Sequence, residues 1–399
     1  MKPMKRILAL NAGSSSIKFS LYRTGEGEEL LYSGFLDRIG REGGRFSVRD
    51  GRGHVLENDS VSPSDHRAAT ESILSWVLSR ADAKPDAVGH RIVHGGQNYS
   101  GPVILSPDML LSLTSLFPYA PEHLPPAVET VRHAWRVFPG TVQVACFDTS
   151  FHASLPPVAR CYPLPAEVRG QGVQRYGFHG LSYEYLLGEL ERQGGRDAAM
   201  GKVILAHLGH GASMAAVKEG RSIDTSMGFS PAGGLVMSTR TGDLDPGVIL
   251  FLLQQKRMNA AEIKEMVNLR SGLLGFSGIS DDMQVLLAKA TENLKAGEAV
   301  DMFCYRAKQY VGSYAAAMGG LDTIVFSGGI GANSPEIRAR ICEGLEFLGI
   351  TVEPARNLAS APLISEEGSG VTVRVIETNE EIVIVRHTLK LLEETRGYT

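Results

Sequence analysis

The sequence of 399 residues has few of the features that mark secreted or membrane-bound proteins. Four cysteines form no C-x-x-C pair and no metal-like spacing, as expected for thiols kept reduced in a cytosol: Cys146, Cys161, Cys304 and Cys342. No apolar run approaches the length of a membrane span, and the run at 7–10 is too short for a signal peptide. We therefore expect a soluble, cytoplasmic protein that has no membrane partner.

An excess of charge of either sign is also missing. Lys and Arg total 40 against 44 Asp and Glu, so the net charge of −4 creates no field that would gather nucleic acid. The sequence contains no G-x-x-x-x-G-K-[ST], and neither Gly209-x-Gly211 nor Gly329-x-Gly331 completes G-x-G-x-x-G. A P-loop or Rossmann fold is therefore not expected, and any recognition of phosphate must be local.

The chain does contain two hairpins of one design. The first covers residues 7–21 with a Gly/Ser-rich turn at 11–16, and the second covers 203–217 with a turn at 207–213. An offset of 198 pairs residues of the two turns: Gly13 with Gly211, and Ser15 with Ser213. This short repeat suggests two copies of one nucleotide-handling unit.

Helical patterns and short strands fill the rest of the chain. Apolar side chains at 73, 74, 77 and 78 share one helix face. Further helix starts are predicted at capping residues: Ser106-Pro107, Asp245-Pro246, Ser280, Ser334-Pro335 and Thr378. Strands are predicted at 142–147, 323–327 and 371–376, so the protein is expected to be α/β. The repeat places a domain boundary near residue 150, which predicts two domains: 1–149 with a returning C-terminal helix at 380–399, and 150–379.

Two glycine-rich segments are candidates for binding a polyanion. In residues 11–18, small side chains let backbone amides approach phosphate, Asn11 can reach a phosphate or a metal-bound water, and Lys18 adds a charge. From this loop alone, a solvated hairpin turn is an equally good interpretation. Residues 326–334 form a third turn, where glycine backbone and a helix N-terminus could face an adenosine or its phosphates. A plain strand-to-helix connection is the alternative.

Four short clusters gather Arg, His or Asp outside any helical period, and all but the second include glycine: residues 90–96, 147–152, 175–180 and 238–245. Loops of this kind at strand ends can present cations to an anion. A hydrogen-bonded core or surface residue is nevertheless the commoner role of each lone histidine: His90, His94, His152 and His207. Arg91 and Arg240 could likewise form structural ion pairs with nearby acids.

Taken together, these segments resemble the acetate kinase family of the acetate and sugar kinase/Hsp70/actin superfamily. The resemblance covers essentially the whole chain, and its most specific strings are Arg175-Tyr-Gly-Phe-His-Gly180 and Asp224-Thr-Ser-Met-Gly228 through Arg240-Thr-Gly-Asp243. It implies two duplicated ribonuclease-H-like (actin-like ATPase) α/β domains with a nucleotide cleft between them, and a homodimer. The N-terminal domain would be the acceptor side and the C-terminal domain would bind the nucleotide.

The resemblance also implies roles for single residues. The catalytic positions are Asp148, Arg91, Arg240 and His179, and the acceptor-binding positions are Arg91, Val93, His123 and Pro231. The nucleotide positions are Lys18, His207, Leu208, Gly209, His210, Gly211, Asp282, Met283, Gln284, Gly329, Ile330, Gly331, Ala332 and Asn333. The metal positions are Asn11 and Glu380, for Mg²⁺ or alternatively Mn²⁺, with ATP or ADP as co-substrate.

The expected reaction is reversible, direct in-line transfer of the γ-phosphoryl of ATP to acetate with Mg²⁺. A carboxylate acceptor needs no base, but two anions must be brought together, so cations become the main requirement. Arg91, Arg240 and His179 would supply them. Asp148 would then hold magnesium, water or an arginine, whereas the hydroxyl acceptor of a sugar kinase would need it as a base.

Five positions depart from the family pattern. On the nucleotide side, His210, Gln284 and Ala332 stand where the family usually has Asn, Arg and Glu, which bears on ATP affinity or base preference. Where the family has the string His-Asn-Pro, this chain has His123-Leu-Pro125. Glu122 stands where Leu is common, and a carboxylate beside the apolar end of the acyl group is costly unless it pairs or turns outward.

Two alternatives follow from these observations. Propionate or another short acid could replace acetate, because one methylene changes binding by only about 1 to 3 kcal/mol. An ATP-gated clamp of the Hsp70/actin type could use the same fold without acyl transfer. Against the clamp stand Arg91, His179 and Arg240, which a protein that merely binds nucleotide would not need.

Overall fold

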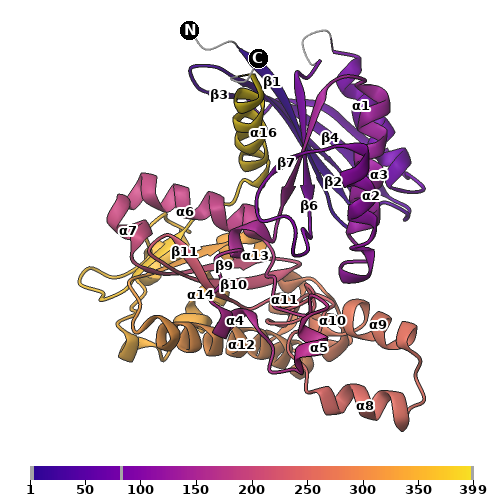
Figure 1. The fold of residues 1–399 in the computed structure, drawn as a ribbon. Coiled ribbons are helices and arrows are strands. Elements are labelled where there is room, and N and C mark those ends of the chain that lie inside the picture. The colour runs from indigo at the N-terminus through magenta and orange to yellow at the C-terminus, as the bar shows by residue number, and fades with distance from the viewer. Residues whose placement is uncertain (1–3, 81–83, 397–399) are drawn as a thin grey trace. The chain divides into compact units, whose positions relative to one another are not determined.

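A computed structural model describes residues 4–80 and 84–396. The chain divides into two compact units, residues 1–150 with 379–399 and residues 151–378. Each unit is built on one β-sheet with helices packed against it (Figure 1). The architecture is therefore mixed α/β, as the sequence predicts.

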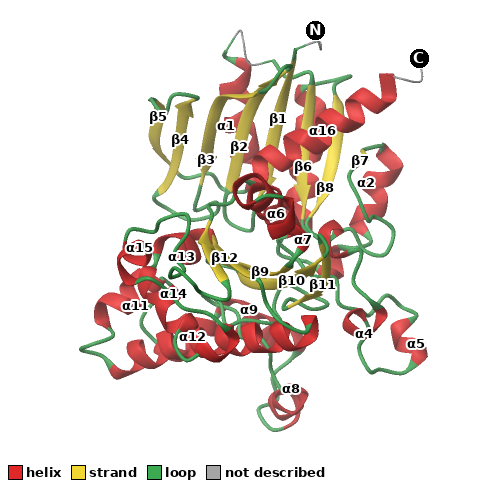
Figure 2. Cartoon of the chain, turned by 90° about the vertical axis from the view of Figure 1, so that its left-hand side faces the viewer, coloured by secondary structure: helices red, strands yellow, loops and turns green. Residues whose placement is uncertain are grey.

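The first unit contains these strands: β1 (Lys5–Ala12), β2 (Ile17–Thr24), β3 (Glu28–Leu36), β4 (Gly44–Asp50), β5 (Val55–Val61), β6 (Ala87–Ile92), β7 (Val103–Ile104) and β8 (Val142–Phe147). Its helices are α1 (His66–Leu78), α2 (Pro107–Thr114), the 3-10 turn η1 (Phe117–Tyr119), α3 (Leu124–Val137) and α16 (Glu380–Arg396). Over the described residues the sheet order is β5-β4-β3-β2-β1-β6-β8-β7, and Figure 2 shows most of this row face-on. β1, β6 and β8 are parallel neighbours, so their carboxyl ends share one edge.

Opposite faces of this sheet pack against different helices. Phe19 of β2 meets Trp76 of α1 at a ring-centroid distance of 6.0 Å. On the other face, a Cβ added at Gly89 of β6 would lie 2.3 Å from Thr388 Oγ1 and 2.4 Å from Ile384 Cγ2. Only glycine at position 89 therefore lets α16 approach the sheet this closely.

The second unit begins in the 3-10 turn η2 (Ser150–His152). Its strands are β9 (Lys202–Leu208), β10 (Ala212–Lys218), β11 (Arg221–Thr225), β12 (Thr323–Ser327) and β13 (Thr372–Val375). Its helices are α4 (Pro157–Arg160), α5 (Ala166–Arg169), α6 (Gly180–Gly194), α7 (Arg196–Met200), α8 (Pro246–Gln254), α9 (Ala260–Leu269), α10 (Gly272–Ser277), α11 (Met283–Lys289), α12 (Leu294–Met318), α13 (Gly328–Asn333), α14 (Pro335–Cys342), η3 (Glu346–Leu348) and α15 (Pro354–Leu358).

The two sheets repeat one topology. The order β11-β10-β9-β12-β13 of the second sheet matches β3-β2-β1-β6-β8 of the first, with an antiparallel meander followed by two parallel strands. The predicted hairpins are confirmed as β1–β2 and β9–β10. Their turns differ in length, because residues 13–16 separate the first pair and 209–211 the second. Ser15 is thus an exposed turn residue, whereas Ser213 is a buried residue of β10.

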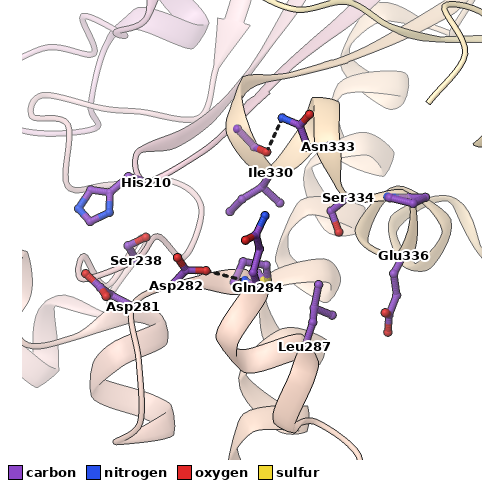
Figure 3. A pocket seen from close by; sticks show the side chains of 13 residues that line it. His210, Ser238, Asp281, Asp282, Gln284, Leu287, Ile330, Asn333, Ser334 and Glu336 are labelled. Carbon is purple, nitrogen blue, oxygen red and sulfur yellow. Dashed lines mark hydrogen bonds between the residues drawn. The ribbon is translucent and has the colours of Figure 1, made fainter. Parts of the chain in front are cut away.

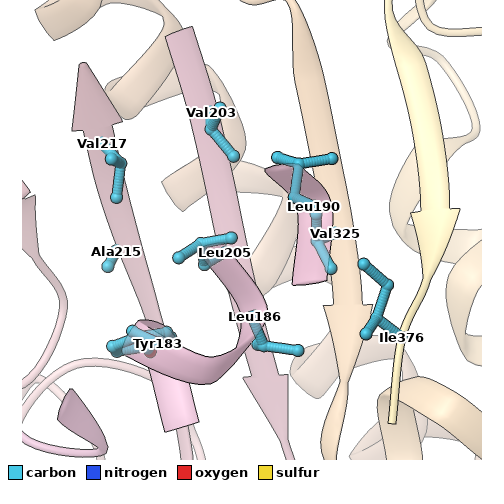
Figure 4. Close-up of a cluster of buried hydrophobic side chains, with 9 residues drawn as sticks. All are labelled: Tyr183, Leu186, Leu190, Val203, Leu205, Ala215, Val217, Val325 and Ile376. Atoms are coloured by element: carbon cyan, nitrogen blue, oxygen red, sulfur yellow. The ribbon is translucent and has the colours of Figure 1, made fainter. Parts of the chain in front are cut away.

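One hydrophobic cluster in the core of the second unit lies between α6 and the sheet (Figure 4). α6 contributes Tyr183, Leu186 and Leu190, which pack on apolar side chains that alternate along the strands. The strand residues of this cluster are Val203, Leu205, Ala215, Val217 and Val325, together with Ile376 after β13. α6 is consequently held at a fixed position on the sheet, and so are the side chains at its N-terminus.

Most predicted helix starts are confirmed, and two are wrong by one or two residues. Ser106, Asp245 and Ser334 cap α2, α8 and α14, each before a proline. For α11 the cap is Asp282 rather than Ser280, whose hydroxyl instead accepts from the backbone amide of Asp282. For α16 the side chain of Asn379, not Thr378, accepts from the Ile382 amide at 3.0 Å.

The glycine-rich segment at 326–334 also differs from the predicted turn, since its residues 328–333 form the helix α13 directly after β12. Gly328 makes this abrupt change of direction with φ +78°, a conformation that favours glycine. Across 4–80 and 84–396, none of the helices is long and apolar enough to cross a membrane.

Candidate active site

Polar side chains gather in the first unit where three parallel strands end. Asn11 lies near the end of β1, Arg91 near the end of β6, and Asp148 directly after β8. The first turn of α16 adds Glu380 and Glu381 to the same place. In open α/β sheets the carboxyl ends of the strands are the usual location of ligand sites.

Arg91 and Asp148 form the centre of this group. Arg91 Nη2 donates to Asp148 Oδ2 at 2.5 Å, and Arg91 Nε donates to Oδ1 and Oδ2 at 3.0 and 3.1 Å. Asp148 is fully buried, whereas 14% of the Arg91 side chain is exposed. Burial alone would lower the pKa of Arg91, but the carboxylates of Asp148 and Glu380 outweigh it and raise that pKa. The guanidinium is therefore permanently charged and held in one orientation.

Asn11 connects this ion pair to the acids of α16. Its amide nitrogen donates to Glu380 Oε2 at 2.9 Å and to Glu381 Oε1 at 3.0 Å, while its oxygen accepts from Arg91 Nη1 at 3.2 Å. Arg91 Nε also lies 3.8 Å from Glu380 Oε2. Glu381 was not predicted as a site residue, although it directly follows Glu380 in the sequence.

These residues fit a magnesium ion that is shared with a ligand. Carboxylate and amide oxygens are hard donors, and Mg²⁺ in nucleotide sites is commonly held by one or two carboxylates plus phosphate oxygens. Within the described part of the chain, no group of three or more His, Cys, Asp or Glu side chains could hold a metal by itself. The two carboxylates beside Asn11 thus suit a partial coordination shell rather than an all-protein cage.

The first unit also contains the predicted residues Val93, His123 and Lys18. Val93 is buried directly after β6, and His123 occupies the N-cap position of α3, where its side chain makes no capping hydrogen bond. Glu122 beside it is partly exposed. Lys18 is an exposed residue of β2 and lines a small groove together with Glu381.

In the second unit His179 has an unusual backbone conformation. It precedes α6 with φ +58° and ψ +24°, the left-handed region that a non-glycine residue rarely adopts. Such conformations persist where the surroundings fix them, and they concentrate at functional sites. Here Gly177 packs so closely against His152 that an added Cβ would lie 2.4 Å from the imidazole ring. His152 thereby supports the loop that presents His179.

His179 lies near Arg240 across the backbone of Gly211. A Cβ built on Gly211 would lie 3.3 Å from His179 Nε2 and 3.7 Å from Arg240 Nη1. The ring of His207 stacks on His179 with centroids 4.3 Å apart and an interplanar angle of 23°. Arg240 Nη1 donates to the carbonyl of Pro231 at 3.0 Å, which fixes one end of the guanidinium. The second unit thus brings together an imidazole, a guanidinium and a glycine-rich turn.

A separate cavity of about 640 Å³ opens in the same unit (Figure 3). Its lining includes seven predicted nucleotide residues: His210, Asp282, Met283, Gln284, Gly329, Ile330 and Asn333. Sequence reasoning missed the rest: Ser238, Asp281, Leu287, Ser334, Pro335 and Glu336. All six lie within three positions of a predicted site residue in the sequence, which is the signal that could have found them. The lining mixes carboxylates and hydroxyls with apolar side chains.

The remaining predicted nucleotide residues do not line this cavity. Leu208, Gly331 and Ala332 are buried, and the carbonyls of Gly331 and Ala332 accept from Arg338 Nη1 at 2.9 Å. Ala332, which replaces a glutamate of the family pattern, therefore faces the protein interior. His207, Gly209 and Gly211 lie at the turn beside His179.

Two of the lone histidines have the ordinary role of a hydrogen-bonded core residue. His90 is buried with Nε2 2.7 Å from Gln143 Oε1, and burial lowers its pKa to about 4. His152 is buried between Ser222 and the Phe178 carbonyl, and burial again lowers its pKa to about 4. Both rings are neutral at physiological pH and serve the fold.

Comparison with known proteins places these sites in a family. The family model described as "Acetokinase family" matches residues 6–386, nearly the whole chain. The chain belongs to the acetokinase family.

Relatives of this acetokinase-family chain extend over its full length. It is 45% identical to the acetate kinase of Methylocella silvestris, over 97% of this chain and 98% of that protein. It is 44% identical to an acetate kinase of Rhodopseudomonas palustris, over 98% of this chain and 99% of that protein.

Solved structures agree with this assignment. The crystal structure of Porphyromonas gingivalis acetate kinase shares 38% identity with a TM-score of 0.86 and covers 97% of this chain and 100% of that one. A propionate kinase from Francisella tularensis shares 34% identity with a TM-score of 0.90 and covers the same shares of the two chains. The acetokinase fold predicted from the sequence is thus confirmed.

Proposed function

We propose that this protein transfers the γ-phosphoryl group of ATP to acetate, reversibly and by direct in-line displacement, to give acetyl phosphate and ADP. Its membership of the acetokinase family carries this proposal, because every residue matched to the transferring phosphoryl is present. An acyl phosphate forms when a carboxylate oxygen attacks phosphorus and the ADP oxygen leaves. The negative charges of the acceptor and of the phosphoryl group must therefore be stabilised as they approach. Arg91, Arg240 and His179 are the groups proposed to do this.

Asp148 is proposed to position Arg91 rather than to act as a base. Both of its oxygens accept hydrogen bonds from the guanidinium, and the carboxylate is fully buried. The acceptor acid is already ionised at neutral pH, so the reaction has no proton for Asp148 to remove. Of the three roles left open by the sequence, holding an arginine is the one that this geometry supports.

The cavity of Figure 3 is proposed to hold the nucleoside part of ATP. Asp281, Asp282 and Glu336 can accept hydrogen bonds from ribose hydroxyls or an exocyclic amine, whereas three carboxylates would repel phosphates. Apolar contacts from Ile330 and Leu287 suit the faces of a base. The phosphates are assigned to the turn at 209–211, beside His179 and Arg240.

Magnesium is the proposed metal, with manganese as an alternative. Glu380, with Glu381 as an added candidate, supplies the carboxylate oxygens that such an ion prefers, and Asn11 holds both carboxylates through its amide nitrogen. When bound, the ion would neutralise charge on the nucleotide phosphates. Glu380 and Glu381 would hold the ion, and Asp148 keeps Arg91 in one orientation.

Propionate or another short acid remains a second candidate acceptor. The similarity to a propionate kinase supports this alternative. Since one methylene changes the binding free energy of an acid by only about 1 to 3 kcal/mol, activity with more than one acid is expected.

Trapping of acyl phosphate with hydroxylamine tests the proposed reaction. Purified protein with Mg-ATP is incubated with acetate, propionate, butyrate or no acid, and hydroxamate and ADP are both measured. Hydroxamate that forms only with an acid, and fastest with acetate, is the expected result. Release of ADP without hydroxamate in every reaction would contradict the proposal and would favour an ATP-gated clamp.

A homodimer is also proposed, and α8 supplies the surface. This helix contains no charged residue and no buried side chain, and Leu250, Phe251 and Leu253 are exposed by 53%, 49% and 42%. An exposed apolar surface of this kind usually marks a protein contact, and a symmetric pair of copies would cover the same helix on both.

Four free thiols, three of them buried, are consistent with the cytoplasmic location that we propose.

A further inference from the structure

A chain of two buried hydroxyl groups ends on the imidazole of His179. Ser213 Oγ lies 2.8 Å from His179 Nδ1, and the Tyr183 hydroxyl forms a short hydrogen bond with the same Ser213 oxygen. Ser213, on β10, and Tyr183, one turn into α6, have no exposed surface. The chain therefore runs from the core of the second unit to His179.

The protons in this chain can be assigned from the number of donors and acceptors. Burial raises the pKa of Tyr183, so its hydroxyl keeps its proton. Within the described residues, Ser213 is the only hydrogen-bond partner of that hydroxyl, so Tyr183 must donate to Ser213. Ser213 then donates its own proton to His179 Nδ1. Nδ1 acts as an acceptor, and the proton of a neutral ring resides on Nε2.

A positively charged imidazole would break this arrangement. With protons on both nitrogens, His179 Nδ1 would have to donate to Ser213, so the two contacts would have to hold three protons. Either the Ser213 proton or the Tyr183 proton would then be left without an acceptor in the core, which is unfavourable for a buried donor. The ring of His207, stacked at 4.3 Å, would also add repulsion if both imidazoles were charged.

We propose that Tyr183 and Ser213 are positioning residues that hold His179 as the neutral Nε2–H tautomer. Nε2 is the nitrogen beside Gly211 and Arg240, so it would present a hydrogen-bond donor to the phosphoryl group. This deepens and rests on the proposed function, and it changes one role expected from the sequence. Arg240 supplies positive charge, whereas His179 supplies a directed N–H.

The imidazole ¹⁵N chemical shifts of His179, measured by NMR on the full chain at neutral pH, test this proposal. A His179→Gln variant identifies the signals. The expected spectrum has a protonated Nε2 and an unprotonated Nδ1. A protonated Nδ1, with or without a protonated Nε2, would overturn the proposal. The measurement needs no turnover, so it is independent of whether acetate is the acceptor.

Two variants test the hydroxyl chain, and a third is their control. Tyr183→Phe keeps the packing of the ring but removes the donor to Ser213, so Ser213 can either donate to His179 Nδ1 or accept from it. We therefore expect a mixture of tautomers and a fall in kcat with little change in KM. Ser213→Ala should change the tautomer and lower kcat further. Tyr314→Phe removes another buried phenol, whose bond goes to the Met214 carbonyl, and should change neither. A pure Nε2–H tautomer and unchanged kcat in Tyr183→Phe would refute the positioning role.

Discussion

Arg91 and Asp148 are joined at two points, by Nη2–Oδ2 at 2.5 Å and Nε–Oδ1 at 3.0 Å. They come from adjacent parallel strands, with Arg91 near the end of β6 and Asp148 just after β8. Asp148 is fully buried and pairs with the charged Arg91. A change at Asp148 alone therefore tests whether this carboxylate acts by holding the guanidinium.

Asp148→Asn should lower kcat by about 10²-fold or more, because the guanidinium loses its fixed orientation and its counter-charge. It should also destabilise the fold by about 3 kcal/mol, since a largely buried charge is left uncompensated. Hydroxamate kinetics and thermal unfolding measure the two effects. Glu129→Gln, which breaks an exposed ion pair with Arg132, should change neither by much. Near-normal turnover in Asp148→Asn would reject the positioning role.

Arg91→Ala and Arg240→Ala should each cost several kcal/mol in kcat/KM, as expected when a cation that stabilises the transition state is removed. Arg240→Lys should recover only part of the loss, because lysine cannot both donate to the Pro231 carbonyl and present a planar fork to phosphate. Steady-state kinetics for ATP and for the acid decide this. Turnover close to wild type in either alanine variant would remove that arginine from the mechanism.

Gly211→Ala should lower kcat by roughly tenfold, because the new methyl group would press on His179 Nε2 from 3.3 Å and displace it. Gly188→Ala on α6 is the matched control, since a Cβ there meets nothing within 4 Å. That change should leave kcat unaltered and slightly favour the helix. Equal activity of the two variants would show that the space around His179 is not critical.

The pH dependence of stability should reflect His90 and His152. Burial lowers the pKa of each from 6.5 to about 4, so between these values the unfolded chain binds protons that the folded chain does not. Their contribution is complete above pH 6.5 and is lost as the pH falls to about 4. It amounts to roughly 3 kcal/mol per histidine.

His90→Gln should therefore make the free energy of unfolding less dependent on pH between about 4 and 6.5. Denaturant titrations at several pH values provide the measurement. His152→Gln should act in the same direction. A slope identical to that of the wild type in both variants would contradict this account.

Leu250→Glu on α8 should convert the proposed homodimer into a monomer, because a charge would be buried at a symmetric apolar contact in both copies. Light scattering after size-exclusion chromatography measures the mass. Leu111→Glu, at an exposed apolar residue of α2, is the control and should leave the mass unchanged. A monomeric wild type, or a dimer that withstands Leu250→Glu, would exclude α8 as the interface.

Local features were accessible from the sequence because they depend on neighbours within a few residues. The hairpins β1–β2 and β9–β10 follow from alternating apolar residues around small-residue turns, and three capped helices follow from a polar residue before proline. The segment at 328–333 was misjudged, because its glycines favour a turn while its position after β12 makes it a helix. Ser213 was matched to a turn but belongs to a strand, since the second turn is shorter.

By itself, the sequence determined which chemical groups are available: the family strings, the two hairpins, the arginines and the histidines. Only the tertiary structure decided how those groups pair. Asn11 and Glu380 are 369 positions apart in the sequence, yet they form a hydrogen bond because α16 packs on β1 and β6 in the space left by Gly89. The proton on His179 is likewise set by Tyr183 and Ser213, which face it only once α6 lies on the sheet. Hydrogen bonds require atoms within about 3 Å, and long-range packing alone brings such distant residues that close.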